Sequence, residues 1–169
     1  MLIDDEIRHL EGKLREGEQP GPGGLEEVTA VGSGDARAVL SRARDVLKVV
    51  LEVIRTDRVV ELEEWRELLP NWFVEKCANE RTLEEEQQWL VWWRGLPREQ
   101  QARAVNEREW TLADWLEWFE PAERQWFWWD ATLTSEDEVS IHVEVEGAPA
   151  PLGALEWLLR CSGAKVIRR

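Results

Sequence analysis

Twelve tryptophans in a chain of 169 residues constrain the fold more than any other feature. Burying one indole removes on the order of 150–250 Å² from water, which is worth roughly 4–6 kcal/mol at about 25 cal/mol/Å². Exposing half of them would forfeit about 20 kcal/mol, more than a typical net stability of ~5–15 kcal/mol. We therefore expect most of the rings to fill an interior between a layer of helices and a small sheet.

The densest aromatic cluster is the stretch "RQWFWWD", residues 124–130. As a helix it would place Trp126 and Trp129 on one face. As a strand it would place Trp126 and Trp128 on one side, with Phe127 and Trp129 on the other. We expect a helical turn that passes into a strand near Trp128, with its rings held between the helices and the sheet.

Apolar residues recur with a 3.6-residue period through most of the chain before residue 121, which predicts a mostly helical protein. Two helix starts carry capping sequences, Thr82 with an acid at Glu85 and Thr111 with an acid three residues later. The longest predicted helix follows "GSG" and has Ser33 or Asp35 as its N-cap. In the predicted helix after Thr82, the row Trp89, Leu90 and Trp93 is expected to face inward.

After residue 130 the period changes to 2, because "EVSIHVEVEG" alternates apolar and polar side chains. This segment and "DATLT", joined by the acidic turn "SEDE", predict a β-hairpin. A late helix, "PLGALEWLLRCSG", follows, and "KVIRR" is open to two readings, a free end or a third strand. The predicted class is therefore α+β, a mostly helical single domain with a C-terminal hairpin or three-stranded antiparallel sheet and one late helix.

Gly and Pro residues suggest how the chain is divided. Residues 1–17 predict an amphipathic helix or arm, residues 18–32 contain "QPGPGG" and predict a linker or loop, and residues 33–169 form the tryptophan-rich α+β domain. A helix joined by such a linker can dock on its own domain or on a second copy. If the chain forms a homodimer, we expect this N-terminal helix to mediate it.

The net charge of −14, from 21 basic and 35 acidic residues, disfavours binding to nucleic acid and to anionic membranes. The same charge suits a basic protein partner. The acidic N-terminal residues do not resemble a secretory signal, and no run of about 20 apolar residues predicts a membrane span. Arginine far outnumbers lysine, which we attribute to a GC-rich bacterial genome, and we expect a cytoplasmic protein.

Few residues are suited to catalysis. The chain has two histidines and two cysteines, none at zinc spacing, so we expect neither a metal nor another cofactor. The weak catalytic candidates are Glu120 and Asp130, which flank the aromatic cluster, His142 on the polar side of its strand, and Cys77, which otherwise fits a small core position.

Four residues are candidates for binding a ligand or a partner. Glu86 lies one turn before Trp89 and predicts an acid-and-aromatic cage for a cation. Trp92, Trp118 and Trp72 flank the inward rows of their helices and suit a ligand wall or partner surface. The leading hypothesis is a non-enzymatic acidic interaction module, such as an inhibitor or immunity protein. The alternatives are a module that binds a cation or sugar and an enzyme of unrecognised type.

Overall fold

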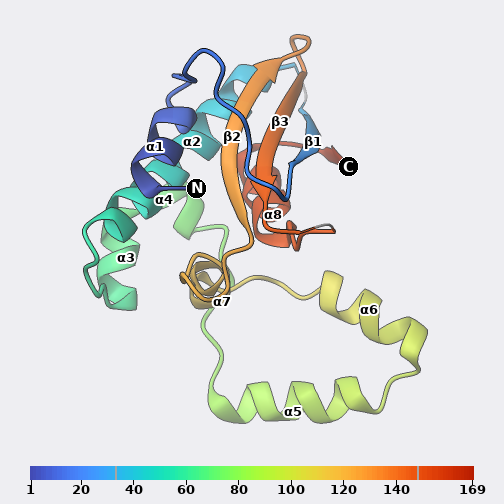
Figure 1. Ribbon diagram of the computed structural model, residues 1–169. Helices are drawn as coiled ribbons and strands as arrows, with labels where there is room; N and C mark the ends of the chain where they lie inside the picture. The colour runs from blue at the N-terminus through green and yellow to red at the C-terminus, as the bar shows by residue number, and fades with distance from the viewer. Residues whose placement is uncertain (33, 148) are drawn as a thin grey trace.

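A computed structural model describes residues 1–32, 34–147 and 149–169 and shows an α+β fold (Figure 1). The predicted class is thus confirmed. The elements in chain order are α1 (Ile3–Leu10), β1 (Leu25–Val31), α2 (Ala36–Arg55), α3 (Leu62–Leu68), α4 (Asn71–Val74), α5 (Leu83–Arg94), α6 (Arg98–Asn106), α7 (Leu112–Glu117), β2 (Trp126–Leu133), β3 (Glu138–Val145), α8 (Gly153–Ser162) and β4 (Val166–Arg168).

The sheet has four strands rather than two or three, in the order β2-β3-β1-β4, and every neighbouring pair is antiparallel. The additional strand is β1, from a segment that the sequence assigned to a linker or loop. Its pattern is short, but Val28 and Ala30 alternate into the core and lie opposite β3. Pairing with β3 and β4 stabilises a strand that its own sequence signals weakly.

The aromatic cluster lies in β2, which begins at Trp126, two residues earlier than expected. Trp126 and Trp128 point into the core and are 1% and 0% exposed. The strand contains a β-bulge between Trp128 and Asp130. A bulge adds one residue and changes the direction of the side chains that follow, so Trp129 is also buried, with its ring 4.6 Å from the His9 ring.

Helices α2 and α8 cover one face of the sheet and lie behind it in Figure 1. Asp35 caps α2, because its side chain accepts a hydrogen bond from Ala38 N; Ser33, the other predicted cap, lies outside the described residues. The capping boxes at Thr82 and Thr111 are both formed. No described helix has the length and apolarity needed to span a membrane.

Helix α1 packs on α2 and β2 of its own chain, and Ile7 and Leu10 are buried there. It ends at Leu10 rather than near residue 17. Gly12, with φ of 75°, turns the chain away from the helix. The apolar residues Ile7 and Leu10 of α1 are therefore covered within the chain, and a homodimer through this helix stays a prediction.

A buried ion pair fixes α1 against the edge strand β2. Glu6 is 1% exposed; its Oε1 accepts a hydrogen bond from Trp128 N at 2.8 Å and one from the guanidinium of Arg124, which is 7% exposed. The carboxylate thus takes the place of a neighbouring strand at this edge, because it satisfies a backbone N–H that no strand pairs.

Helices α5 and α6 form a hairpin that extends away from the rest of the molecule in Figure 1. We call residues 83–106 the arm. None of the twelve residues of α5 is buried. The predicted inward row on this helix therefore does not reach the core of the domain. Trp89 and Trp93 are half-buried, with the Trp93 indole held by α6, whereas Leu90 is 37% exposed.

The Glu6→Ala substitution should lower the free energy of unfolding by about 3–5 kcal/mol, because it leaves Arg124 as an unpaired buried charge. Urea unfolding followed by circular dichroism measures the change. The exposed Glu16→Ala variant is the control and should stay within about 0.5 kcal/mol of the wild type. A loss below about 1 kcal/mol for Glu6→Ala would contradict a structural role for the pair.

Candidate functional site

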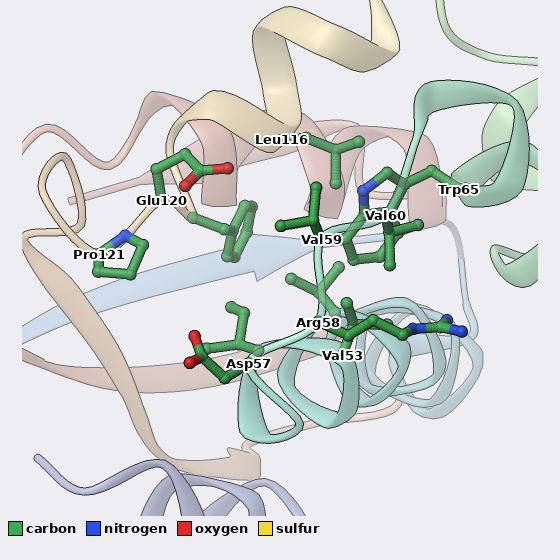
Figure 2. A pocket seen from close by; sticks show the side chains of 12 residues that line it. Val53, Asp57, Arg58, Val59, Val60, Trp65, Leu116, Glu120 and Pro121 are labelled. Carbon is green, nitrogen blue, oxygen red and sulfur yellow. The ribbon is translucent and has the colours of Figure 1, made fainter.

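The strongest candidate site is an apolar pocket of about 390 Å³ between the end of α2, the loop before α3, and α7 (Figure 2). We call it the acidic pocket. It is lined by Val50, Val53, Ile54, Asp57, Arg58, Val59, Val60, Trp65, Leu116, Phe119, Glu120 and Pro121. Its volume falls in the lower part of the range of about 300–1,000 Å³ that is usual for ligand sites.

A residue in the left-handed backbone conformation shapes one side of the pocket. Helix α2 ends at Arg55, and Asp57 has φ of 50°, a conformation that Asp tolerates better than most residues. It redirects the chain so that Val59 and Val60 pass along the pocket before α3 begins. The side chain of Val59 is 88% exposed, which is unusual for an apolar residue beside a cavity.

The opposite side of the pocket is built on α7. The Thr111 capping box starts this helix, and Trp115 is fully buried with its ring 4.6 Å from the ring of Phe119. That contact holds Phe119 in the wall, while Glu120 follows at the mouth and Pro121 closes the segment. The position of Glu120 is therefore set by a rigid aromatic contact one residue away.

Two carboxylates give the pocket its charge. In Figure 2 Asp57 and Glu120 lie at one end of the pocket and the Arg58 guanidinium lies at the other. Arg58 is 2.9 Å from Glu64. Neither Asp57 nor Glu120 makes an ion pair or accepts a side-chain hydrogen bond within the described parts of the chain.

The surface around the pocket is acidic as well. Five further exposed acids lie on or beside α3 and α7: Glu61, Glu63, Glu67, Glu117 and Glu123. The nearby base Arg66 lies 3.0 Å from Glu80. An apolar floor with unpaired carboxylates at its mouth can hold an aliphatic stem that ends in a cation.

Of the catalytic candidates, Glu120 lies at this pocket, and none of the described residues that line its wall is a histidine, cysteine or serine. Asp130 and His142 come together elsewhere, as cross-strand neighbours on β2 and β3. His142 Nδ1 lies 2.7 Å from Asp130 Oδ1, and both side chains are about one-third exposed (34% and 32%). They lie on the sheet face away from α2 and α8, next to the hydrogen bond from Ser140 to Glu27.

The carboxylate can orient the imidazole as in an acid–base pair. The sequence named both residues without pairing them, because the bulge at residue 129 sets the register between β2 and β3.

Cys77 lies at the end of α4, with its Sγ 3.6 Å from Phe73 O. Burial raises the pKa of its thiol to about 11; Arg66 opposes this shift and Glu80 adds to it. Burial, reinforced by Cys77, raises the pKa of Cys161 to about 12. Both thiols therefore stay protonated near neutral pH and are poor nucleophiles.

The predicted cage around Glu86 holds a cation that belongs to the protein itself. The Arg108 guanidinium lies 4.1 Å over the Trp89 ring and donates a hydrogen bond to Glu86. Arg81 Nη1 lies 3.4 Å from the same carboxylate and 2.7 Å from Asp114. These contacts tie the arm to α7.

The three flanking tryptophans have different environments. Trp92 is 53% exposed on the arm. Trp118 lines a second cavity, of about 630 Å³, together with Trp110 and Trp157. Trp72 is half-buried beneath the Arg42 guanidinium at 6.0 Å. Trp92 is thus the one that presents most of its ring to solvent.

No group of three or more His, Cys, Asp or Glu side chains within residues 1–32, 34–147 and 149–169 is arranged to hold a metal ion. Comparison with known proteins gives no match to a family model, a curated protein or a solved structure.

The sequence did not single out Asp57, Val59 and Val60. A signal was present in "TDRVVE", where two valines stand among charged residues between two helices. An apolar pair in a connecting loop favours a binding surface. The left-handed conformation of Asp57 had no comparable signal, because the residue is not a glycine.

The rate at which iodoacetamide alkylates Cys77 in the folded protein should be about 100-fold or more below that of N-acetylcysteine at pH 7.5, because little thiolate is present. The Cys161→Ser variant isolates Cys77, and the urea-unfolded chain gives the unprotected rate. With a pKa of about 11, the rate should still rise between pH 9 and pH 10. A plateau near pH 8.5 would show that Cys77 is an ordinary exposed thiol.

Proposed function

We propose that this chain is a non-enzymatic interaction module of the bacterial cytoplasm, which binds a basic segment of another protein in the acidic pocket. The supporting observation is the combination of an apolar floor with the unpaired carboxylates of Asp57 and Glu120 at the mouth. An inhibitor or immunity protein that blocks a basic enzyme is the specific form that fits best.

The pocket suits a lysine or arginine beside an apolar residue. The aliphatic stem would pack on Val53, Ile54 and Phe119, and each buried methylene contributes about 0.8 kcal/mol. The cationic head would reach the two carboxylates. Because these acids are exposed, each ion pair adds only ~0.2–1 kcal/mol, and the apolar contact supplies most of the affinity.

A protein partner is favoured over a small cation because the binding features extend beyond the pocket. Val59 is 88% exposed beside it, and a protein surface would cover this side chain. The surrounding exposed acids would attract a basic surface over a distance and raise the association rate at low salt. At Glu86, by contrast, Arg108 already occupies the place of a cationic ligand.

A selection from a random peptide display library tests the proposal. We expect the enriched peptides to carry Lys or Arg next to an aliphatic or aromatic residue. For one such peptide, the double variant Asp57→Asn, Glu120→Gln should bind about 10-fold more weakly, since two ion pairs of about 0.7 kcal/mol each are lost. Isothermal titration calorimetry at 50 and 300 mM salt measures the affinity.

The matched control is the double variant Asp45→Asn, Glu136→Gln, which removes the same two charges from exposed positions outside the acidic pocket. It should bind within about twofold of the wild type. If both double variants lost the same affinity for the peptide, the loss would be a general charge effect, and binding in the acidic pocket would be refuted. Enriched peptides without basic residues would do the same.

A further inference from the structure

The second cavity, of about 630 Å³, lies between the last turn of α6, the end of α7 and one side of α8. We call it the tryptophan pocket, because Trp110, Trp118 and Trp157 all line it. None of its described lining residues belongs to the acidic pocket. Its volume lies within the range of about 300–1,000 Å³ that is usual for sites that bind small molecules.

The indole walls of this pocket are held in place by the protein behind them. The Trp157 ring lies 5.2 Å from the fully buried ring of Phe73 and 6.2 Å from the Trp110 ring. Trp110 O accepts a hydrogen bond from Ala78 N at 2.8 Å, which fixes the backbone that carries this second ring. All three indoles are half-buried, so part of each ring packs on the protein and another part faces the pocket. The aromatic wall is therefore formed before a ligand binds, which lowers the cost of binding.

The charged residues of the tryptophan pocket are three arginines and one glutamate, in a chain whose net charge is −14. Arg169 Nε donates a hydrogen bond to Glu156 Oε1 at 2.6 Å, and Arg108 donates one to Glu86. The exposed side chain of Arg160 makes no ion pair or hydrogen bond within the described parts of the chain. The glutamate is thus already neutralised, and one guanidinium is left for a ligand that carries an anion.

We infer that the tryptophan pocket binds a small molecule in which an aromatic ring carries an anionic head, either a carboxylate or a phosphate. The ring would lie against the indoles of Trp110, Trp118 and Trp157, since offset and edge-to-face aromatic contacts are favourable beyond the area that they bury. The head would pair with Arg160, because a planar guanidinium can donate two parallel hydrogen bonds to either group.

The charges around the pocket favour this class of ligand over a cation or a polyanion. A cation would be repelled by the unpaired Arg160. The net charge of the chain repels anions over a distance, but salt at physiological concentration screens this repulsion beyond about 8 Å, so contacts inside the pocket decide. A long polyanion such as nucleic acid would also meet the acidic surface outside the pocket, which a small molecule does not reach.

Nuclear magnetic resonance of the ¹⁵N-labelled full chain at pH 7 tests this inference. The probe is 2-naphthoate, and its control is 2-naphthamide, which has nearly the same shape without the charge. We expect 2-naphthoate to shift the indole N–H signals of Trp110, Trp118 and Trp157, assigned by single Trp→Phe variants, and to leave the Trp65 signal of the acidic pocket unchanged. It should bind about 5-fold or more tightly than 2-naphthamide. The probe 2-naphthyl phosphate should shift the same signals, and the tighter of the two anions identifies the preferred head.

The Arg160→Gln variant should weaken 2-naphthoate about 3- to 10-fold and leave 2-naphthamide within about twofold, because it removes only the charge that faces the anion. The control Arg37→Gln removes a charge from an exposed position on α2 outside the pocket and should change neither affinity by more than about twofold. Circular dichroism confirms that each variant folds.

Three results would overturn the inference: no shift of the three indole signals with about 2 mM 2-naphthoate, equal affinity for 2-naphthoate and 2-naphthamide, or an affinity for 2-naphthoate that Arg160→Gln does not change. The double variant Asp57→Asn, Glu120→Gln should leave the binding of 2-naphthoate within about twofold of the wild type. This last measurement separates the tryptophan pocket from the proposed function of the acidic pocket.

Discussion

The aromatic contacts of Trp115 are the interaction on which the rest of the structure depends. The ring is fully buried, and its Nε1 donates to Ala154 O on α8 at 3.0 Å. It lies 4.6 Å from the Phe73 ring on α4 and 4.6 Å from the Phe119 ring, which in turn lies 5.7 Å from Trp126 on β2. One indole therefore joins the connecting helices to the sheet and to the late helix.

This arrangement separates the features that stabilise the protein from those that we propose for binding. Eleven of the twelve indoles are buried or half-buried, and Trp92 is the exposed one. Because Trp115 fixes α7, it also places Glu120 at the mouth of the acidic pocket. The arm extends from the same region, and its tie to α7 is the ion pair between Arg81 and Asp114.

Local chemistry made some features predictable and left others hidden. The capping boxes at Thr82 and Thr111 follow from residues three apart, so the sequence located both helix starts. Strand β1 was missed because its local pattern is short and its pairing with β3 is a tertiary contact. The periodicity of α5 correctly indicated a helix with a tryptophan row, but periodicity does not say which neighbour the row meets. The acidic pocket depends on the turn at Asp57, which no pattern in the sequence indicated.

Hydrogen exchange of the native protein, measured by mass spectrometry at 1 µM, tests most directly whether Trp115 makes α7 as stable as the core elements α2 and β3. The account predicts that amides of α7 exchange about as slowly as those of α2 and β3, and that amides of the arm exchange at least 100-fold faster, because only local opening is needed there. Fast exchange in α7 together with the arm, or an arm as protected as α2, would contradict it.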